Sequence, residues 1–132
     1  MSQILTADPL TPANFARYGD VLSAHGQPDR MINAGLCGRY HDRARLDFAS
    51  GKAGISIFDA VPRALPYDFD LVERHPEGSQ AFIPMTEAPF LVIVAPDEGG
   101  QPGRPLAFLT SGAQAINLHR GTWHGVDRKS VV

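Results

Sequence analysis

Glycine and proline interrupt this chain so often that they favour short strands joined by turns over long helices. The 132 residues include 13 glycines and 11 prolines, and both residue types are poor in helix interiors and common in turns. About eight short strands with one helix are typical of a β-sandwich or a barrel of jelly-roll type. We therefore predict an all-β fold that forms a single domain over residues 1–132.

The clearest helix signal lies near the start of the chain. Thr11 is a suitable N-cap, and the proline that follows it fits the first helical position. Leu10 can pack on Phe15 as a hydrophobic staple, and Gly19 suits the left-handed position that ends a helix. We expect a short helix from Thr11 to Tyr18, packed outside the sheet.

The strand candidates share apolar or alternating residues bounded by turn residues. They are the segments 21–22, 46–48, 54–61, 67–75, 79–85, 89–95, 106–110 and 115–119, followed by a turn into 123–124. The segment 89–95 is apolar throughout, as expected for a strand covered on both faces. We expect a long loop over 25–38 and an exposed hairpin loop over 97–105.

Composition and charge exclude several classes of protein. A net charge of −2 provides no basic surface for nucleic acid. The longest apolar run is far too short to span a bilayer, and the N-terminus lacks the features of a secretory signal. A single cysteine, Cys37, cannot form an internal disulfide and is typical of a reducing cytoplasm.

The segment 73–85 combines ionisable and apolar residues in an unusual way. Counting back by twos along the predicted strand places Glu73 and His75 on one face with Phe69 and Leu71. Ionisable groups on an apolar face cost free energy unless they are paired or bind a ligand. Two interpretations stay open at this point, a functional site or a structural Glu–His pair that locks a hairpin.

A second segment, 119–124, contributes the other half of the signal. Together the two segments resemble the two motifs of the cupin superfamily. By this resemblance Glu73, His75 and Gln80 match the ligand positions of the first motif, and His124 matches the last ligand of the second. Glu73 replaces a histidine, Gln80 replaces a carboxylate and His119 replaces a proline. The resemblance implies a divalent metal held weakly, since an amide oxygen is a poor donor, and no organic cofactor.

A narrower resemblance covers nearly the whole chain. The segments 10–21, 32–42, 73–85 and 117–124 are similar, in order and spacing, to the ureidoglycolate lyase family. This resemblance implies a cytoplasmic homodimer of cupin-like β-barrels that releases urea from ureidoglycolate, leaving glyoxylate, in allantoin (purine) degradation. Family members continue past the His124 segment with further strands, so we expect this jelly-roll to lack its C-terminal strands.

The reaction implied by the resemblance suggests roles for particular residues. Removal of a hydroxyl proton suits imidazole or a metal-assisted base. We assign Glu73, His75 and His124 to the reacting centre, as metal ligands or as acid and base. Gln80 is expected to contact the metal or the substrate, and His119 to brace the turn.

The substrate carboxylate needs a cation, and arginine offers a planar fork for it. Arg39 and Arg120 are both candidates, and His41 can line the mouth of the site. Two other functions stay open for the same residues. One is a metal-dependent cupin oxygenase or isomerase, and the other is a non-enzymatic cupin that binds a small carboxylate.

Overall fold

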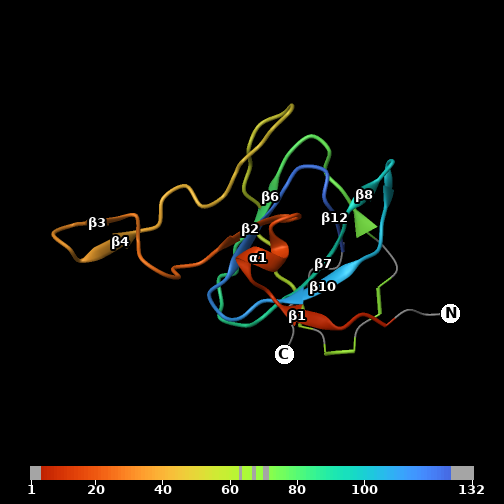
Figure 1. The fold of residues 1–132 in the computed structure, drawn as a ribbon, viewed down its shortest axis with the longest axis horizontal. Helices are drawn as coiled ribbons and strands as arrows, with labels where there is room; N and C mark the ends of the chain where they lie inside the picture. Colours follow the sequence, from red (N-terminus) through yellow and green to blue (C-terminus); the bar gives the residue numbers. More distant parts are fainter. Residues whose placement is uncertain (1–3, 63, 67, 70–71, 126–132) are drawn as a thin grey trace.

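The computed structural model describes residues 4–62, 64–66, 68–69 and 72–125. The fold is mostly β with one short helix, and two sheets make up its body (Figure 1). The larger sheet has the order β1 (Ala7–Pro9), β10 (Leu106–Leu109), β7 (Leu91–Ala95), β12 (Trp123–Gly125) and β5 (Val72–Glu73). The smaller sheet has the order β2 (Gly19–Leu22), β11 (Ala115–Leu118) and β6 (Gln80–Phe82).

Two further hairpins stand outside these sheets. They pair β3 (Arg30–Ile32) with β4 (Cys37–Arg39), and β8 (Asp97–Glu98) with β9 (Gln101–Pro102). Within the described ranges, all pairs between these strands are antiparallel except β1 with β10. Among the described strands, these pairings do not close the two sheets into one barrel.

Residues from both sheets and from the helix meet in one hydrophobic core. Its buried members are Leu10, Phe15, Tyr18, Val92, Val94, Phe108, Ile116 and Leu118. The rings of Phe15 and Phe108 meet edge to face, with centroids 5.4 Å apart, a favoured arrangement for aromatic pairs. In β7 every residue after Leu91 is buried, which confirms the prediction of a strand covered on both faces.

The helix α1 (Pro12–Phe15) is shorter than predicted. Thr11 is its N-cap as expected, and its hydroxyl accepts a hydrogen bond from the backbone N–H of Asn14 at 3.1 Å. The prediction for Gly19 was wrong, because this residue begins β2 and has no positive φ. A Cβ at Gly19 would collide with the backbone oxygen of Asn117, so a close approach of two strands requires the glycine.

Most of the predicted strands are present in shortened form. The exceptions are 46–48, which contributes only an isolated bridge between Phe48 and Gly78, and 54–61, which has no strand pairing. The loop expected over 25–38 contains β3 and the start of β4, and β1 was not predicted. The expected hairpin over 97–105 is confirmed by β8 and β9.

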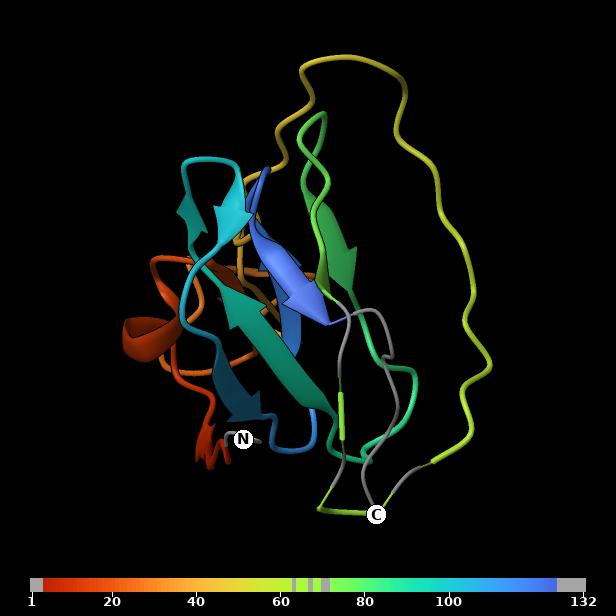
Figure 2. The ribbon, with the colours of Figure 1, turned by 90° about the vertical axis from the view of Figure 1, so that its right-hand side faces the viewer.

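The segment 54–61 shows why apolar alternation alone does not make a strand. Ile55 and Ile57 are 99% and 84% exposed, and Figure 2 shows this part of the chain as an extended arc apart from the sheets. A strand needs hydrogen bonds from a neighbour, and no described strand pairs with this segment.

Some predictions fall on residues outside the described ranges. They concern Leu71 as a member of the inward face, part of the strand 67–75, and the chain beyond Gly125. Of the helices in the described ranges, none has the length and apolar character that crossing a bilayer requires.

Candidate active site

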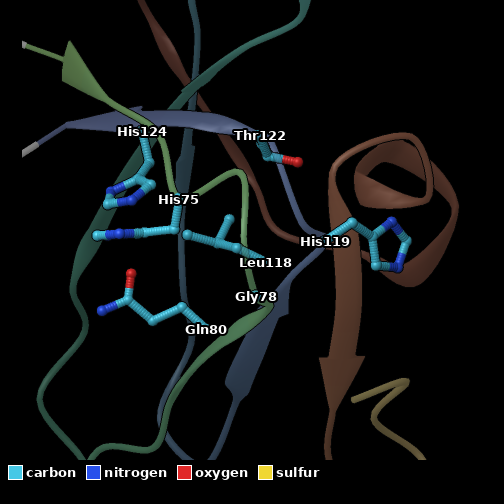
Figure 3. Close-up of a pocket in the computed structure, with 7 residues that line it drawn as sticks. All are labelled: His75, Gly78, Gln80, Leu118, His119, Thr122 and His124. Carbon is cyan, nitrogen blue, oxygen red and sulfur yellow. The ribbon is translucent and has the colours of Figure 1, made fainter. Parts of the chain in front are cut away.

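A small pocket takes its lining from both sheets. It is lined by His75, Gly78, Gln80, Leu118, His119, Thr122 and His124. His124 comes from β12 of the larger sheet, whereas Gln80 and Leu118 come from β6 and β11 of the smaller one. Figure 3 shows the rings of His75 and His124 and the amide of Gln80 extending on the same side of the pocket.

Strand pairing brings Glu73 to the two imidazoles. Glu73 of β5 lies directly opposite His124 of β12, so the two side chains share one face. His75 follows β5 by two residues, and its backbone oxygen accepts a hydrogen bond from the N–H of Gly121 at 3.0 Å. The potential ligand atoms of Glu73, His75 and His124 all lie within 4.8 Å of one another.

The two imidazoles differ in their surroundings. His124 is 3% exposed, and its ring lies 5.2 Å from the ring of His75, measured between centroids. Nδ1 of His124 lies 3.3 Å from the backbone oxygen of Gly125, which can only accept, so Nδ1 carries the proton in this contact. His75 is exposed, and its Nε2 lies 3.7 Å from Oε1 of Glu73.

The amide of Gln80 faces the same space. Its Oε1 atom is buried, and no described residue donates a hydrogen bond to it. Burying a carbonyl oxygen without a donor costs free energy, so a cation or a donor from a ligand would satisfy this atom. The amide was expected to contact metal or substrate, and its position is compatible with both.

A polar network holds the turn that precedes β12. One carboxylate oxygen of Asp20 accepts hydrogen bonds from the backbone N–H of Arg45 at 2.7 Å and from Nδ2 of Asn117 at 3.0 Å. Its other oxygen lies 3.4 Å from Nε2 of His119. Burial raises the pKa of Asp20, but the hydrogen bonds from Arg45, Asn117 and His119 outweigh it and leave this pKa below its ordinary value.

His119 therefore points away from the pocket's other side chains, toward β2 (Figure 3). Its backbone oxygen accepts a hydrogen bond from the N–H of Thr122 at 3.1 Å. These contacts fit the predicted role of His119 as a brace for the turn.

The arginines proposed for the substrate carboxylate do not line the pocket. Arg120 is exposed, and its Nε lies 3.7 Å from Oδ2 of Asp47. Arg39 is at the end of β4, where its guanidinium donates to Nδ1 of His41 at 2.8 Å. Within the described ranges, the structure brings Arg39 and His41 together but leaves them outside the pocket of their own chain.

Sequence reasoning missed several residues that shape the site. Leu118 and Thr122 line the pocket, and the ring of Phe82 lies 6.2 Å from that of His124. Their position in the sequence could have indicated them, because each lies within a few residues of a predicted site residue. The indole of Trp123, next to His124, donates to Asp97 at 2.9 Å.

The donor set fits a divalent cation. Two imidazoles and one carboxylate are common ligands of zinc and iron. Their potential ligand atoms lie within 4.8 Å of one another, so small movements of the side chains would let all three bind one cation. The buried Oε1 of Gln80 is a possible fourth donor.

Comparisons with known proteins show the family of this chain. The family model described as ureidoglycolate lyase matches residues 2–127. A ureidoglycolate lyase from Rhodobacter capsulatus is 59% identical over 123 residues, which are 92% of this chain and 76% of that protein. Ureidoglycolate lyase 2 of Rhizobium meliloti is 48% identical, over 89% of this chain and 74% of the relative. A ureidoglycolate lyase from Chelativorans sp. is also 48% identical, over 92% and 75%. This chain belongs to the ureidoglycolate lyase family.

Proposed function

We propose that this chain releases urea from ureidoglycolate, leaving glyoxylate, in the pocket between the two sheets. The observation that carries the proposal is that Glu73 and His75 of one segment and His124 of another place their potential ligand atoms within 4.8 Å of one another, in a chain of this family. Membership of the family supplies the reaction, and the geometry supplies the groups that can move its protons.

The reaction needs an acid and a base but no water. A base removes the proton of the substrate hydroxyl, and the oxygen forms the carbonyl of glyoxylate. The carbon–nitrogen bond breaks, and its electron pair stays on the ureido nitrogen. That nitrogen takes up a proton and leaves as urea, so the proton removed and the proton delivered balance.

In the acid–base form of the proposal the two imidazoles have different roles. Protonation of His124 at Nδ1 leaves Nε2 as the ring's acceptor, and this atom takes the hydroxyl proton. His75 delivers a proton to the leaving nitrogen. The carboxylate of Glu73, 3.7 Å from Nε2 of His75, provides a countercharge for the imidazolium.

The same residues would hold a divalent metal if one is bound. Glu73, His75 and His124 would be its ligands, with Gln80 as a weak fourth. When bound, the metal supplies polarisation of the substrate hydroxyl and so lowers the pKa of that group. Because the amide of Gln80 is a neutral and weak donor, we expect the metal to be labile and easily lost.

The family resemblance also supports a larger assembly. We infer that the two sheets are the walls of a cupin jelly-roll, because the pocket lies between them and takes residues from both. We further propose a homodimer in the cytoplasm, where a single exposed cysteine would stay reduced.

A product assay tests the function directly. Purified protein is incubated with ureidoglycolate, and urea, glyoxylate and ammonia are measured over time. Equal amounts of urea and glyoxylate support the lyase. Ammonia in place of urea would indicate hydrolysis of the ureido group, and binding without turnover would favour a non-enzymatic carboxylate-binding cupin.

A further inference from the structure

The hairpin β3–β4 has the features of an arm that contacts another molecule. Figure 1 shows it at one end of the molecule, projecting from both sheets. It pairs with no other described strand, and a two-stranded hairpin alone is marginally stable in water. Leu36 and Met31 on this arm are 88% and 51% exposed, so the arm presents apolar surface that a partner could cover.

The arm is nevertheless held in a defined shape at its base. Asp29 accepts a hydrogen bond from the backbone N–H of His41 at 2.8 Å and pairs with Arg43 at 2.6 Å. The hydroxyl of Tyr40 donates to the backbone oxygen of Gly26 at 2.9 Å. A preorganised arm loses little conformational entropy when it binds.

One face of the arm is suited to an anion. Arg30 and Arg39 are directly opposite each other in the β3–β4 pair, so two positive side chains share one face, where like charges repel. No described carboxylate forms an ion pair with either of them. The guanidinium of Arg39 donates to Nδ1 of His41, which leaves an N–H at Nε2 of that ring as a further donor.

The pocket lacks a positive side chain among its described residues, and the arm carries two. Its lining, as far as the chain is described, contains no arginine or lysine, although the proposed substrate carries a carboxylate. Arg120, next to the pocket residue His119, pairs with Asp47 at 3.7 Å. The arginine before His75, Arg74, pairs with Asp97 at 3.0 Å and lies over the ring of Trp123.

We propose that the β3–β4 arm of one copy of this chain completes the pocket of a second copy, where Arg39 binds the carboxylate of the substrate. The inference rests on the proposed function for the identity of that anion. It makes the active site a shared one, in which Glu73, His75 and His124 come from one copy and Arg39, oriented by His41, comes from the other. A closed two-fold dimer would form two such sites.

Mixing two impaired variants tests whether the site is shared. Arg39→Ala should lower kcat/KM by about 10- to 100-fold, the loss expected when charge-assisted hydrogen bonds are removed. His124→Ala removes a pocket residue. If the site is shared, a mixed dimer has one pocket in which both residues are native, and an equal mixture recovers about a quarter of wild-type kcat/KM. No recovery, with mixed dimers confirmed by native mass spectrometry, would overturn the proposal.

Two controls accompany the mixture. The pair His124→Ala and Glu73→Gln should not complement, because both changes affect the same pocket. Arg104→Ala, at an exposed arginine outside the arm, should leave kcat/KM unchanged. Arg39→Lys should mainly raise KM, since an ammonium group retains the charge but cannot form the two parallel hydrogen bonds that a guanidinium makes with a carboxylate.

A cross-linking experiment reports on the arm without any need for activity. Cys37, the single cysteine of the chain, is exposed on the arm, and Glu77→Cys places a second thiol beside the pocket residue Gly78. A short bismaleimide should join two copies of this variant far more efficiently than a variant carrying Gln101→Cys on the other hairpin. Equal yields from the two, or the same yield after Cys37→Ser, would overturn the arm's placement. If the cross-link forms but the unmodified wild-type protein releases no urea in a parallel assay, the proposed function alone is contradicted.

Discussion

Glu73 and His124 are directly opposite each other on the antiparallel strands β5 and β12. This register places a carboxylate and a 3%-exposed imidazole on the same face, and His75 joins them from the chain that leaves β5. A shift of the register by one residue would move Glu73 to the other face of the sheet. The pairing of two short strands is therefore what assembles the proposed reacting centre.

Changes within this pair should impair catalysis more than stability. We expect His124→Ala and Glu73→Gln each to lower urea release by about two to four orders of magnitude, the usual contribution of a positioned acid or base. The control His25→Ala, in an exposed loop outside the site, should change little. Steady-state assays on variants shown to be folded by thermal melts measure the effect. Near-normal turnover by folded His124→Ala would show that the reacting centre lies elsewhere.

Gln80→Glu should convert a weak metal site into a stronger one. A carboxylate is a better donor than the amide whose Oε1 is now buried without a described donor. Titration calorimetry should show that the variant binds Mn²⁺ or Zn²⁺ at least about tenfold more tightly than wild type. In the presence of a chelator the variant should have a lower Tm than wild type, because its carboxylate would be buried without a partner. Gln101→Glu, on the exposed β9, is the matched control. Unchanged metal affinity in Gln80→Glu would place the metal, if any, away from this side chain.

The Asp20 network should make stability depend on pH in the acid range. Its hydrogen bonds hold the pKa of Asp20 below its ordinary value despite burial, so the folded state binds fewer protons than the unfolded state. The resulting stabilisation is complete above about pH 4 and is lost as pH falls through the lowered pKa. Asp20→Asn should lower the free energy of unfolding at pH 7 by about 1–3 kcal/mol. Its Tm should also depend less on pH between about 5 and 3.

The comparison for this prediction is Asp59→Asn, which changes an exposed carboxylate without touching the network. Thermal melts of wild type and both variants across the same pH range provide the measurement. An Asp20→Asn curve parallel to that of wild type would show that this carboxylate does not link protons to folding.

Gly19→Ala should destabilise the fold because the new Cβ would collide with the backbone oxygen of Asn117. Backbone atoms in a paired strand cannot move aside as a side chain can, and overpacking of this kind costs about 1–3 kcal/mol or more. Gly54→Ala is the control, since no atom lies within 4 Å of its added Cβ. The free energies of unfolding of the two variants, measured with denaturant, should differ by that amount. Equal values would mean that β2 and β11 can move apart without a cost in free energy.

The sequence by itself determined the features that depend on near neighbours. The cap at Thr11, the buried strand β7 and the alternation that places Glu73 and His75 on one face are all local patterns, because a turn residue or an alternation acts over a few positions. Glu73 and His75 were predicted from such a pattern along one strand, whereas His124 was predicted from the resemblance to the cupin motifs. Their roles in catalysis stay predictions.

Only the tertiary structure decided which strands pair and what the remaining residues contact. The segments 54–61 and 89–95 are both rich in apolar residues, yet β7 has neighbours on both sides while 54–61 has none among the described strands. Gly19 ends no helix, because the approach of Asn117 requires it within a strand. Arg39 was a candidate for the pocket, but it lies on an arm that projects from the sheets. Strand pairing depends on hydrogen bonds between residues far apart in the chain, and local patterns contain no information about which partner will supply them.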